Sequence, residues 1–486
     1  AKIKYNTLIN DIALRNLDMK KKSIKHYEGM TRRDAIKLMG ISPLAASVLA
    51  STSGSSIAEA SADVSGKVII VGGGSGALMA LSRLKRAITN PDITIIAPNE
   101  VHLYQPGQVF VGAGEMEIED ILLDNNDYIH PDEVTWIKDE VKVFDPDNNT
   151  VTTRAGEELK YDYLIVATGA QYNYEEIEGL TKEDIGKNGI TSVYLSDLEA
   201  GTSVGATATW EWNKALKEAA KTSKPKVIFT HPNTAIKCGG APQKVMYLAA
   251  DYLKQDGLSA EYSFMSSLQN LFHLPEVDKS LHEVQDSYDT ITCKFQHHLQ
   301  SVDVQKKQAT FLHVYSEKVI DEDFGETEIV SHEDTVIMDY DFLHISPPMS
   351  AVTALVNSKL VDFTKWLEVD KHTLQHKRYS NVFGIGDVCG IPMNKTGGSA
   401  RHQGPIVIDN LISVMKNEKA KEIFDGYTVC PIKTAYGKIL MAEFNYEGIS
   451  PTIPFLPIQT PRYFWWLFDL YQLKLMYQYL MLTGRF

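Results

Sequence analysis

Residues 67–77, KVIIVGGGSGA, decide the fold. The first five residues form a continuous apolar run, which is typical of a central strand in a parallel sheet that is covered on both faces. The run continues into the pattern G-x-G-x-x-A, formed by Gly72, Gly74 and Ala77, and an apolar helix is expected over 78–88. Glycines at this spacing let bare backbone approach a pyrophosphate at the N-terminus of the helix. We therefore predict a dinucleotide-binding α/β domain; the alternative is a glycine-rich turn that binds no ligand.

The segments that follow extend this first domain. A second strand is expected over 93–96, but Ala97 stands where an acid would bind the adenosine ribose, and Glu100 is only a weak substitute. A small hairpin within 141–153 leads to an apolar strand that ends in Ala167-Thr168-Gly169. A strand with this ending, after a first glycine-rich loop, resembles the flavoprotein disulfide-reductase superfamily, in which the turn packs against the FAD pyrophosphate region.

A second nucleotide-like unit lies at 226–245, KVIFTHPNTAIKCGGAPQKV. A short strand over 227–229 and a helix over 241–254 are expected on the two sides of its turn. A pyridine-nucleotide domain needs a G-x-G-x-x-G turn here, but this turn has Cys238 where the nucleotide would go. Lys237, the glycine pair and the helix start favour a thiolate over a thiol. The unit therefore predicts sulfur chemistry in place of NAD(P) binding.

Length, charge and cysteine content exclude several classes of protein. A chain of 486 residues is long enough for two or three domains. Its formal net charge of -14 argues against a nucleic-acid partner, because binding to phosphates needs a basic face. The cysteines Cys238, Cys293, Cys389 and Cys430 are too few for a disulfide scaffold, and they lack the paired spacing of a zinc site, so no metal is expected.

Two later motifs complete the predicted FAD-binding domain. In the superfamily a Gly-Asp pair ends a strand and its carboxylate binds a ribityl hydroxyl, a role that falls to Asp387. Lys395 and Thr396 precede a helix whose N-terminal amides would face the flavin N1/O2 edge. Cys389 lies two residues beyond the aspartate. Because open α/β sheets place ligands at the carboxyl ends of their strands, where Cys238 also lies, we expect these two thiols to form a redox pair.

Four motifs together resemble the sulfide:quinone oxidoreductase family over 67–486: YQPG at 104–107, KCGGAPQK at 237–244, GDVC at 386–389 and KTGG at 395–398. The resemblance implies non-covalently bound FAD, oxidation of sulfide to sulfane sulfur or polysulfide, and transfer of electrons to a membrane quinone. With the motifs above, it implies catalytic Cys238 and Cys389, FAD contacts at Gly72, Gly74, Ser75, Gly76, Ala77, Val141, Ala167, Thr168, Gly169, Asp387, Lys395 and Thr396, and a quinone pocket at Tyr104, Pro106 and Phe444. Cys293 and Cys430 match no redox position and are interpreted as structural thiols.

The predicted fold class is α/β, with two Rossmann-like domains of the FAD/NAD(P)-binding type and a C-terminal amphipathic segment that associates with a membrane. The expected boundaries are 1–64 for a leader, 65–185 and 344–450 for the two parts of the FAD-binding domain, 186–343 for the second Rossmann-like domain, and 451–486 for the tail. A homo-oligomer is also expected.

The leader resembles a Tat-type export signal. It contains Arg32-Arg33, an apolar run over 38–50 that is too short to span a bilayer, and an Ala-x-Ala site within 58–62. We therefore expect a peripheral membrane protein on the periplasmic side of the inner membrane. The alternative is a basic amphipathic leader that is never cleaved.

The tail, 454–486, is the most apolar part of the mature chain. Its aromatic run at 463–468 is followed by Asp469 and Lys474, and this mixture favours helices that lie in the plane of the membrane interface. Such a tail near the flavin would give a bilayer-soluble quinone its route to the site. The alternatives are a core helix that caps the FAD domain and a dimer contact.

Three rival functions remain open. The flavoprotein subunit of flavocytochrome c sulfide dehydrogenase would donate electrons to a cytochrome c partner, but it holds FAD through a cysteine in the segment corresponding to 104–114, and no cysteine precedes Cys238. A type II NADH dehydrogenase would need the glycine loop that Cys238 interrupts. A flavoprotein that carries or senses persulfide without turnover is disfavoured only by the retained thiols and aromatic residues.

Overall fold

The computed structural model describes residues 62–197, 203–320 and 327–486. The predicted leader, with almost all of its export signal, lies outside these residues, so the leader stays a prediction.

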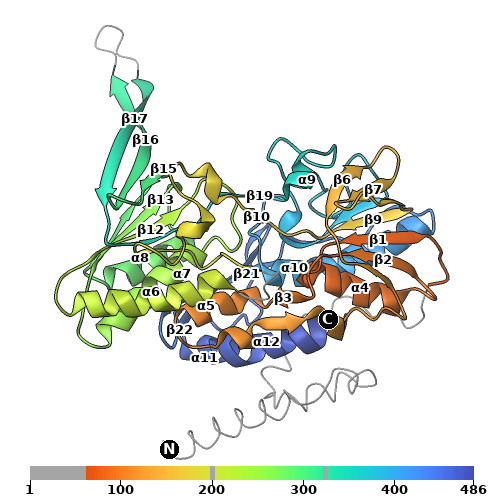
Figure 1. Ribbon diagram of the computed structural model, residues 1–486, viewed down its shortest axis with the longest axis horizontal. Helices are drawn as coiled ribbons and strands as arrows, with labels where there is room; N and C mark the ends of the chain where they lie inside the picture. The colour runs from red at the N-terminus through yellow and green to blue at the C-terminus, as the bar shows by residue number, and fades with distance from the viewer. Residues whose placement is uncertain (1–61, 198–202, 321–326) are drawn as a thin grey trace, which may run out of the picture.

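Two five-stranded parallel sheets form the frame of the molecule, which confirms the predicted α/β class (Figure 1). The first sheet has the order β20-β9-β1-β2-β5, with bounds Val382–Gly384, Tyr163–Val166, Lys67–Val71, Asp92–Ile96 and Thr135–Ile137. The second sheet has the order β11-β18-β12-β13-β14, with bounds Ile190–Thr191, Phe342–His344, Lys226–His231, Glu261–Ser266 and Ile291–Lys294. Because β20 pairs with β9 although the two are far apart in sequence, the first sheet is completed only when the chain returns from the second.

Helices pack against both sheets. Helix α4 (Ser75–Ala87) follows β1 and packs on α10 (Gly397–Met415). Their close approach needs Gly404, where a Cβ atom would lie 2.5 Å from the Met79 side chain. The second sheet is accompanied by α6 (Val204–Ala220), α7 (Ala241–Lys254) and α8 (Pro275–Asp286). The observed bounds of α7 are those expected from the sequence.

Antiparallel strands form three further sheets of three strands each within the described residues. The predicted hairpin is confirmed as β6 (Val141–Asp145) and β7 (Thr150–Thr153), joined by β8 (Glu158–Lys160). An unpredicted arm projects from the second sheet in Figure 1, formed by β15 (His297–Asp303), β16 (Gln308–Ile320) and β17 (Thr327–Asp339). Near the tail lie β21 (Thr428–Ala435), β22 (Lys438–Asn445) and β23 (Gly448–Ile449). The short elements are β3 (Val101–Leu103), η2 (Gln105–Gly107), α5 (Gln108–Gly112), β4 (Leu122–Asp124), β10 (Gln171–Tyr172), β19 (Met349–Ser350) and α9 (Thr353–Val356).

The tail is helical and lies along one edge of the body (Figure 1). It consists of α11 (Tyr463–Leu467), the π-helical turn η8 (Phe468–Gln472), α12 (Leu473–Met476) and a second π-helical turn, η9 (Tyr477–Met481). Trp465 and Trp466 are buried against the body, whereas Phe455 and Tyr463 are 72% and 51% exposed. Within the described ranges, no helix combines the length and apolar character needed to cross a bilayer.

Candidate active site

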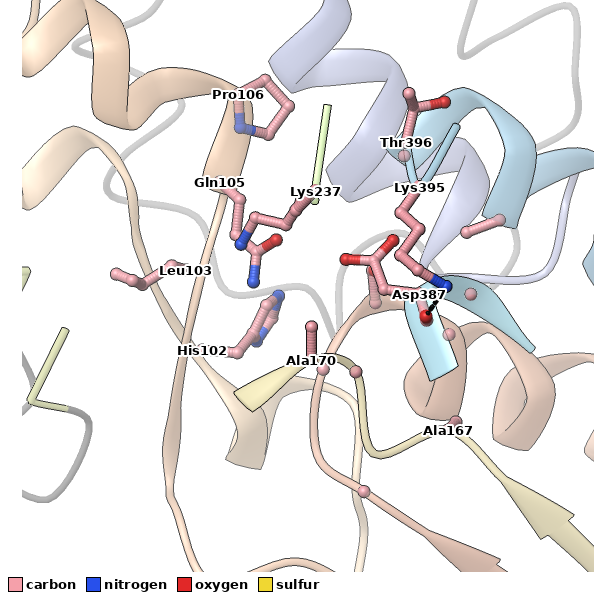
Figure 2. A pocket seen from close by; sticks show the side chains of 18 of the residues that line it. His102, Leu103, Gln105, Pro106, Ala167, Ala170, Lys237, Asp387, Lys395 and Thr396 are labelled. Carbon is pink, nitrogen blue, oxygen red and sulfur yellow. Dashed lines mark hydrogen bonds between the residues drawn. The ribbon is translucent and has the colours of Figure 1, made fainter. Parts of the chain in front are cut away.

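A cavity of about 1030 Å3 connects the glycine-rich loop after β1 with the tail. Its first end is lined by 72–76 and 167–169, and its other end by side chains of the tail such as Trp465 and Phe468. Figure 2 shows the middle of this space, where Lys237, from the connection between β12 and α7, meets Asp387 and Lys395, from the connection between β20 and α10. One cavity therefore combines a nucleotide-like end, a charged centre and an apolar end.

The glycine-rich end fits the pyrophosphate of FAD. Gly72 has a φ of 127°, and a Cβ atom there would lie 2.3 Å from the carbonyl oxygen of Ala167. A Cβ on Gly74 would meet nothing within 4 Å, so this backbone is open to the cavity. Gly74 also caps α4 without a side-chain hydrogen bond, which leaves the first amides of the helix available to an anion.

Nearly all of the predicted FAD contacts line this cavity. They are Gly72, Gly74, Ser75, Gly76, Val141, Ala167, Thr168, Gly169, Asp387, Lys395 and Thr396. The exception is Ala77, which is fully buried inside α4 and belongs to the hydrophobic core. Its small size therefore serves helix packing rather than ligand contact.

The segment after β2 departs from the usual ribose site. Ala97 lines the cavity, whereas Glu100, the predicted weak substitute, forms an exposed ion pair with Lys138 and is not part of the cavity wall. Asn125 instead organises this region. Its Nδ2 donates to the carbonyl oxygens of Gly73 at 3.1 Å and Asn99 at 2.9 Å. No sequence pattern indicated this role, because Asn125 lies in an irregular turn far from the glycine motif.

The charged centre is built around Lys395. Its Nζ donates to the backbone oxygens of Asp387 at 2.7 Å and Cys389 at 2.9 Å, and lies 3.6 Å from the Trp366 ring centroid. Burial lowers the pKa of Lys395 to about 8, although the Asp387 carboxylate opposes this shift. Burial also raises the pKa of Asp387, while Lys237 and Lys395 lower it. This carboxylate therefore lies in the cavity where a ribityl hydroxyl was predicted to bind.

Cys238 lies in a strained turn at the centre of the cavity wall. Its φ of 53° is left-handed, which is uncommon for a residue with a side chain and is frequent at functional sites. The backbone is held by two hydrogen bonds, from Cys238 N to Lys395 O and from Ala241 N to Cys238 O, both 2.7 Å. These contacts fix the sulfur at the start of α7.

Two groups approach the Cys238 sulfur. The Sγ of Cys430, on β21, lies 3.1 Å away, and the Nζ of Lys244, on α7, donates to Cys238 at 2.9 Å. The hydrogen bond with Cys430 is the largest cause that lowers the pKa of Cys238 well below its usual value; burial opposes it, and the Lys244 ammonium supports it. The same contact, with burial, raises the pKa of Cys430. These surroundings therefore favour the thiolate at Cys238 and the thiol at Cys430.

The thiol that the structure places beside Cys238 is not the predicted Cys389. The sulfur of Cys430, which was interpreted from the sequence as structural, contacts that of Cys238, whereas Cys389 is 1% exposed and does not line the cavity. The Cys389 sulfur packs against Gly384, where a Cβ atom would lie 2.9 Å from it. Burial raises the pKa of Cys389 to about 12. Although Cys389 follows the carboxyl end of a strand as expected, its side chain points into the core.

The lysine that acts on Cys238 also differs from the predicted one. Lys237 Nζ donates to the Tyr172 hydroxyl at 2.5 Å instead, and Lys244, one helical turn into α7, contacts the sulfur. Adjacent residues on a backbone point in different directions, so sequence proximity to Cys238 was a poor guide.

The predicted quinone pocket is partly assembled. Tyr104 and Pro106 line the cavity, but Phe444 does not. On β22 the side chains alternate, so Met441 and Glu443 face the cavity while Phe444 packs against Phe272 and His273 on the other side, at centroid distances of 5.8 and 4.8 Å. Apolar lining that the sequence did not assign comes from Val429, Trp465, Phe468, Leu473, Met476 and Phe486.

Comparison of the sequence with known proteins identifies the family of this chain. The family model for pyridine nucleotide-disulphide oxidoreductases matches residues 66–202. The mitochondrial sulfide:quinone oxidoreductase of Dictyostelium discoideum is 36% identical over 394 residues, which cover 80% of each chain. This chain belongs to the sulfide:quinone oxidoreductase family. The mitochondrial sulfide:quinone oxidoreductase of Mus musculus is 35% identical, again over 80% of each chain.

A solved sulfide:quinone oxidoreductase, from Aquifex aeolicus, has the same fold. It superposes with a TM-score of 0.60 over 80% of this chain and 84% of that chain, at 21% sequence identity. Membership of the sulfide:quinone oxidoreductase family makes this chain a flavoprotein oxidoreductase, as the motifs predict.

Proposed function

We propose that this protein oxidises sulfide to sulfane sulfur and passes two electrons through FAD to a membrane quinone, with Cys238 and Cys430 as its redox pair. The observation that carries the proposal is the 3.1 Å separation of the two sulfurs beside Lys244. Cys238 lines a cavity whose glycine-lined end fits FAD and whose far end is apolar. FAD, when bound, supplies the two-electron step between the sulfur substrate and the quinone.

The chemistry of the thiol pair follows from its surroundings. Hydrosulfide attacks one sulfur of the oxidised pair and forms a persulfide there. The bond that joined this sulfur to its partner breaks, and the other sulfur leaves as a thiolate. Cys238 lines the cavity, whereas Cys430 is buried behind it, so we assign the attack of hydrosulfide and the resulting persulfide to Cys238. Cys430 leaves as the thiolate, and the Lys244 ammonium stabilises its charge. Re-formation of the sulfur link releases one proton and two electrons, which balances the oxidation of hydrosulfide.

The charges around the site support each step. Lys244 holds the leaving thiolate, and the pKa of this lysine is raised because Cys238 and Cys430 outweigh the opposing effect of burial. Gly240 lets β21 approach the turn, since a Cβ atom there would lie 3.0 Å from the Cys430 sulfur. Lys395 and the start of α10 place positive charge next to the Cys238 turn, where Thr396 caps the helix by accepting from Ser399 N.

The apolar end of the cavity favours a quinone over a protein electron acceptor. A bilayer-soluble headgroup would enter between Tyr104, Pro106 and the tail residues Trp465 and Phe468. The exposed side chains of Phe455, Tyr463 and Phe464 support a tail that lies in the membrane interface. The Dictyostelium and mouse relatives are named as mitochondrial; the periplasmic side and the export signal proposed here rest on residues outside the described part of the chain.

The test is sulfide-dependent reduction of decylubiquinone by the purified, FAD-loaded protein. We expect quinone reduction that is lost in Cys238→Ser and in Cys430→Ser. Sulfide-driven bleaching of the flavin without quinone reduction would favour a persulfide carrier. Reduction of cytochrome c in place of quinone would favour the sulfide dehydrogenase function, and bleaching by NADH would overturn the proposal.

A further inference from the structure

The apolar end of the cavity contains a buried ion pair between two segments that are distant in sequence. Lys433 lies on β21, three residues after Cys430, and Asp469 lies in η8 of the tail. Lys433 Nζ is 2.5 Å from Asp469 Oδ2, and the two side chains are only 2% and 0% exposed. Removing two charges from water is costly, so a pair in this position suggests a role beyond stability.

The polar groups here have hydrogen-bonding capacity left over. Within the described chain, Asp469 Oδ1 and the Tyr104 hydroxyl are both buried without a hydrogen-bond partner. Tyr104, Lys433 and Asp469 all line the cavity. Buried polar atoms are almost always paired in proteins, so an unpaired acceptor and an unpaired hydroxyl on one cavity wall indicate a ligand with a polar atom.

We propose that Lys433, held in place by Asp469, donates a proton to a carbonyl oxygen of the bound quinone, while Tyr104 hydrogen-bonds the headgroup. The inference rests on the proposed function, since it names the groups that serve its second half-reaction. Reduction of the quinone takes two electrons and two protons. One proton leaves Lys433 as its N–H bond breaks and an O–H bond forms on the quinone; the second comes from solvent water, which also reprotonates the amine.

The charges that surround Lys433 suit proton release. Burial is the largest cause that lowers its pKa, and the Lys244 ammonium on α7 acts in the same direction. The carboxylate of Asp469 and the thiolate of Cys238 raise it, which keeps the ammonium formed before the reaction. Phe110, on α5, lies under the ammonium with its ring centroid 4.2 Å from Nζ and brings no competing acceptor.

Glu443 also lines this cavity, but both of its carboxylate oxygens already accept hydrogen bonds. Glu443 Oε1 accepts from the hydroxyls of Tyr427 at 2.7 Å and Thr452 at 2.6 Å, and Oε2 accepts from Thr452 N at 2.9 Å. With both oxygens occupied, Glu443 has less capacity to contact a quinone than the Lys433–Asp469 pair.

The chain provides a matched control for the effect of tail docking. Lys474, also in the tail, lies 3.8 Å from Asp120 of the body, with side chains 20% and 31% exposed. Neither residue lines the cavity. Lys474→Met therefore removes a tail-to-body ion pair of the same chemistry without changing the cavity wall.

The experiment separates the two half-reactions by stopped flow on the FAD-loaded protein. Lys433→Arg keeps the positive charge near Cys238 and should be bleached by sulfide at the wild-type rate, whereas Lys433→Met should be bleached about two- to fivefold more slowly. Decylubiquinone should reoxidise the flavin of both variants about 100-fold more slowly. An arginine at this position keeps the charge yet holds its proton, so slow reoxidation in both variants identifies proton donation rather than charge. Quenching of tail tryptophan fluorescence by decylubiquinone measures binding directly, and Lys433→Arg should bind within a few-fold of wild type.

Each outcome decides the inference. Reoxidation of Lys433→Arg within twofold of wild type would overturn it, as would an equal slowing in Lys474→Met, which would assign the effect to tail docking. A loss of quinone binding in Lys433→Arg that accounts for the whole rate change would make the lysine a binding group only. If wild-type flavin is not bleached by sulfide, the proposed function fails instead, whatever the Lys433 variants do.

Discussion

Cys238 and Cys389 both lie just beyond a parallel sheet, one after a central strand and the other after an edge strand, and they have opposite properties. Each follows the carboxyl end of a parallel strand, β12 or β20, and each has a lysine nearby. Lys244 points its ammonium at the Cys238 sulfur, whereas Lys395 points its ammonium at the backbone oxygens of Asp387 and Cys389. The pKa of Cys238 is lowered and that of Cys389 is raised to about 12. The direction of the ammonium and the exposure of the sulfur, rather than position after a strand, distinguish Cys238 from Cys389.

The largest expected difference between the two sites is in turnover. Cys238→Ser and Cys430→Ser should each lower sulfide:decylubiquinone activity by about 1000-fold or more, because a hydroxyl cannot form the sulfur link. Cys389→Ser should retain activity within about threefold, since its side chain does not reach the cavity. Steady-state quinone reduction at equal FAD content measures all three. Loss of activity in Cys389→Ser with normal FAD content would restore Cys389 as the partner.

Local sequence patterns predicted the frame that carries these cysteines. Strand β1, the hairpin of β6 and β7, and helix α7 follow from apolar runs and turn residues within short windows, and the structure confirms them. The pairing of Cys238 with Cys430 could not be obtained in this way. The two lie 192 residues apart, and they meet because β21 packs on α7.

The roles of Gly240 and Phe444 become clear only from the residues that surround them in the folded structure. Gly240 must lack a side chain because a Cβ there would lie 3.0 Å from the Cys430 sulfur. The family resemblance assigns Phe444 to the quinone pocket, but the alternation of side chains along β22 turns it away from the cavity. Which face of a strand lines the cavity depends on how segments from distant parts of the chain assemble. A short stretch of sequence does not contain this information.

A smaller difference is expected from the lysine alone. Lys244→Met should slow sulfide-driven bleaching of the flavin by about 10- to 100-fold, because the thiolate loses its counter-charge. Its loss should also raise the pKa of Cys238, so that the pH profile of bleaching moves to higher pH. Lys254→Met, at the other end of α7, is the matched control and should leave rate and profile unchanged. An unaltered profile in Lys244→Met would mean that Cys430 alone sets the pKa.

The two sites should also differ in alkylation by iodoacetamide. At pH 7 the reduced protein should react at Cys238 about tenfold faster than an ordinary exposed thiol, because the lowered pKa provides more thiolate and only part of this gain is offset by weaker nucleophilicity. Cys389 should stay unmodified up to about pH 9 while the protein is folded, since its pKa is about 12 and it is buried. Peptide mass spectrometry of timed samples measures both. Labelling of Cys389 at a rate similar to Cys238 would contradict the contrast.

The smallest expected effect is on stability, to which Cys389 contributes by packing in the core. Its sulfur fills the space beside Gly384 and Leu367, so Cys389→Ala should lower the free energy of unfolding by about 1 kcal/mol through the cavity it leaves. Cys238→Ala should not destabilise the protein to the same degree, because its sulfur faces the cavity and its left-handed backbone is equally unfavourable for alanine and cysteine. Urea unfolding of the FAD-loaded variants compares the two. A larger loss of stability in Cys238→Ala would show that its contacts with Cys430 and Lys244 also hold β21 against α7.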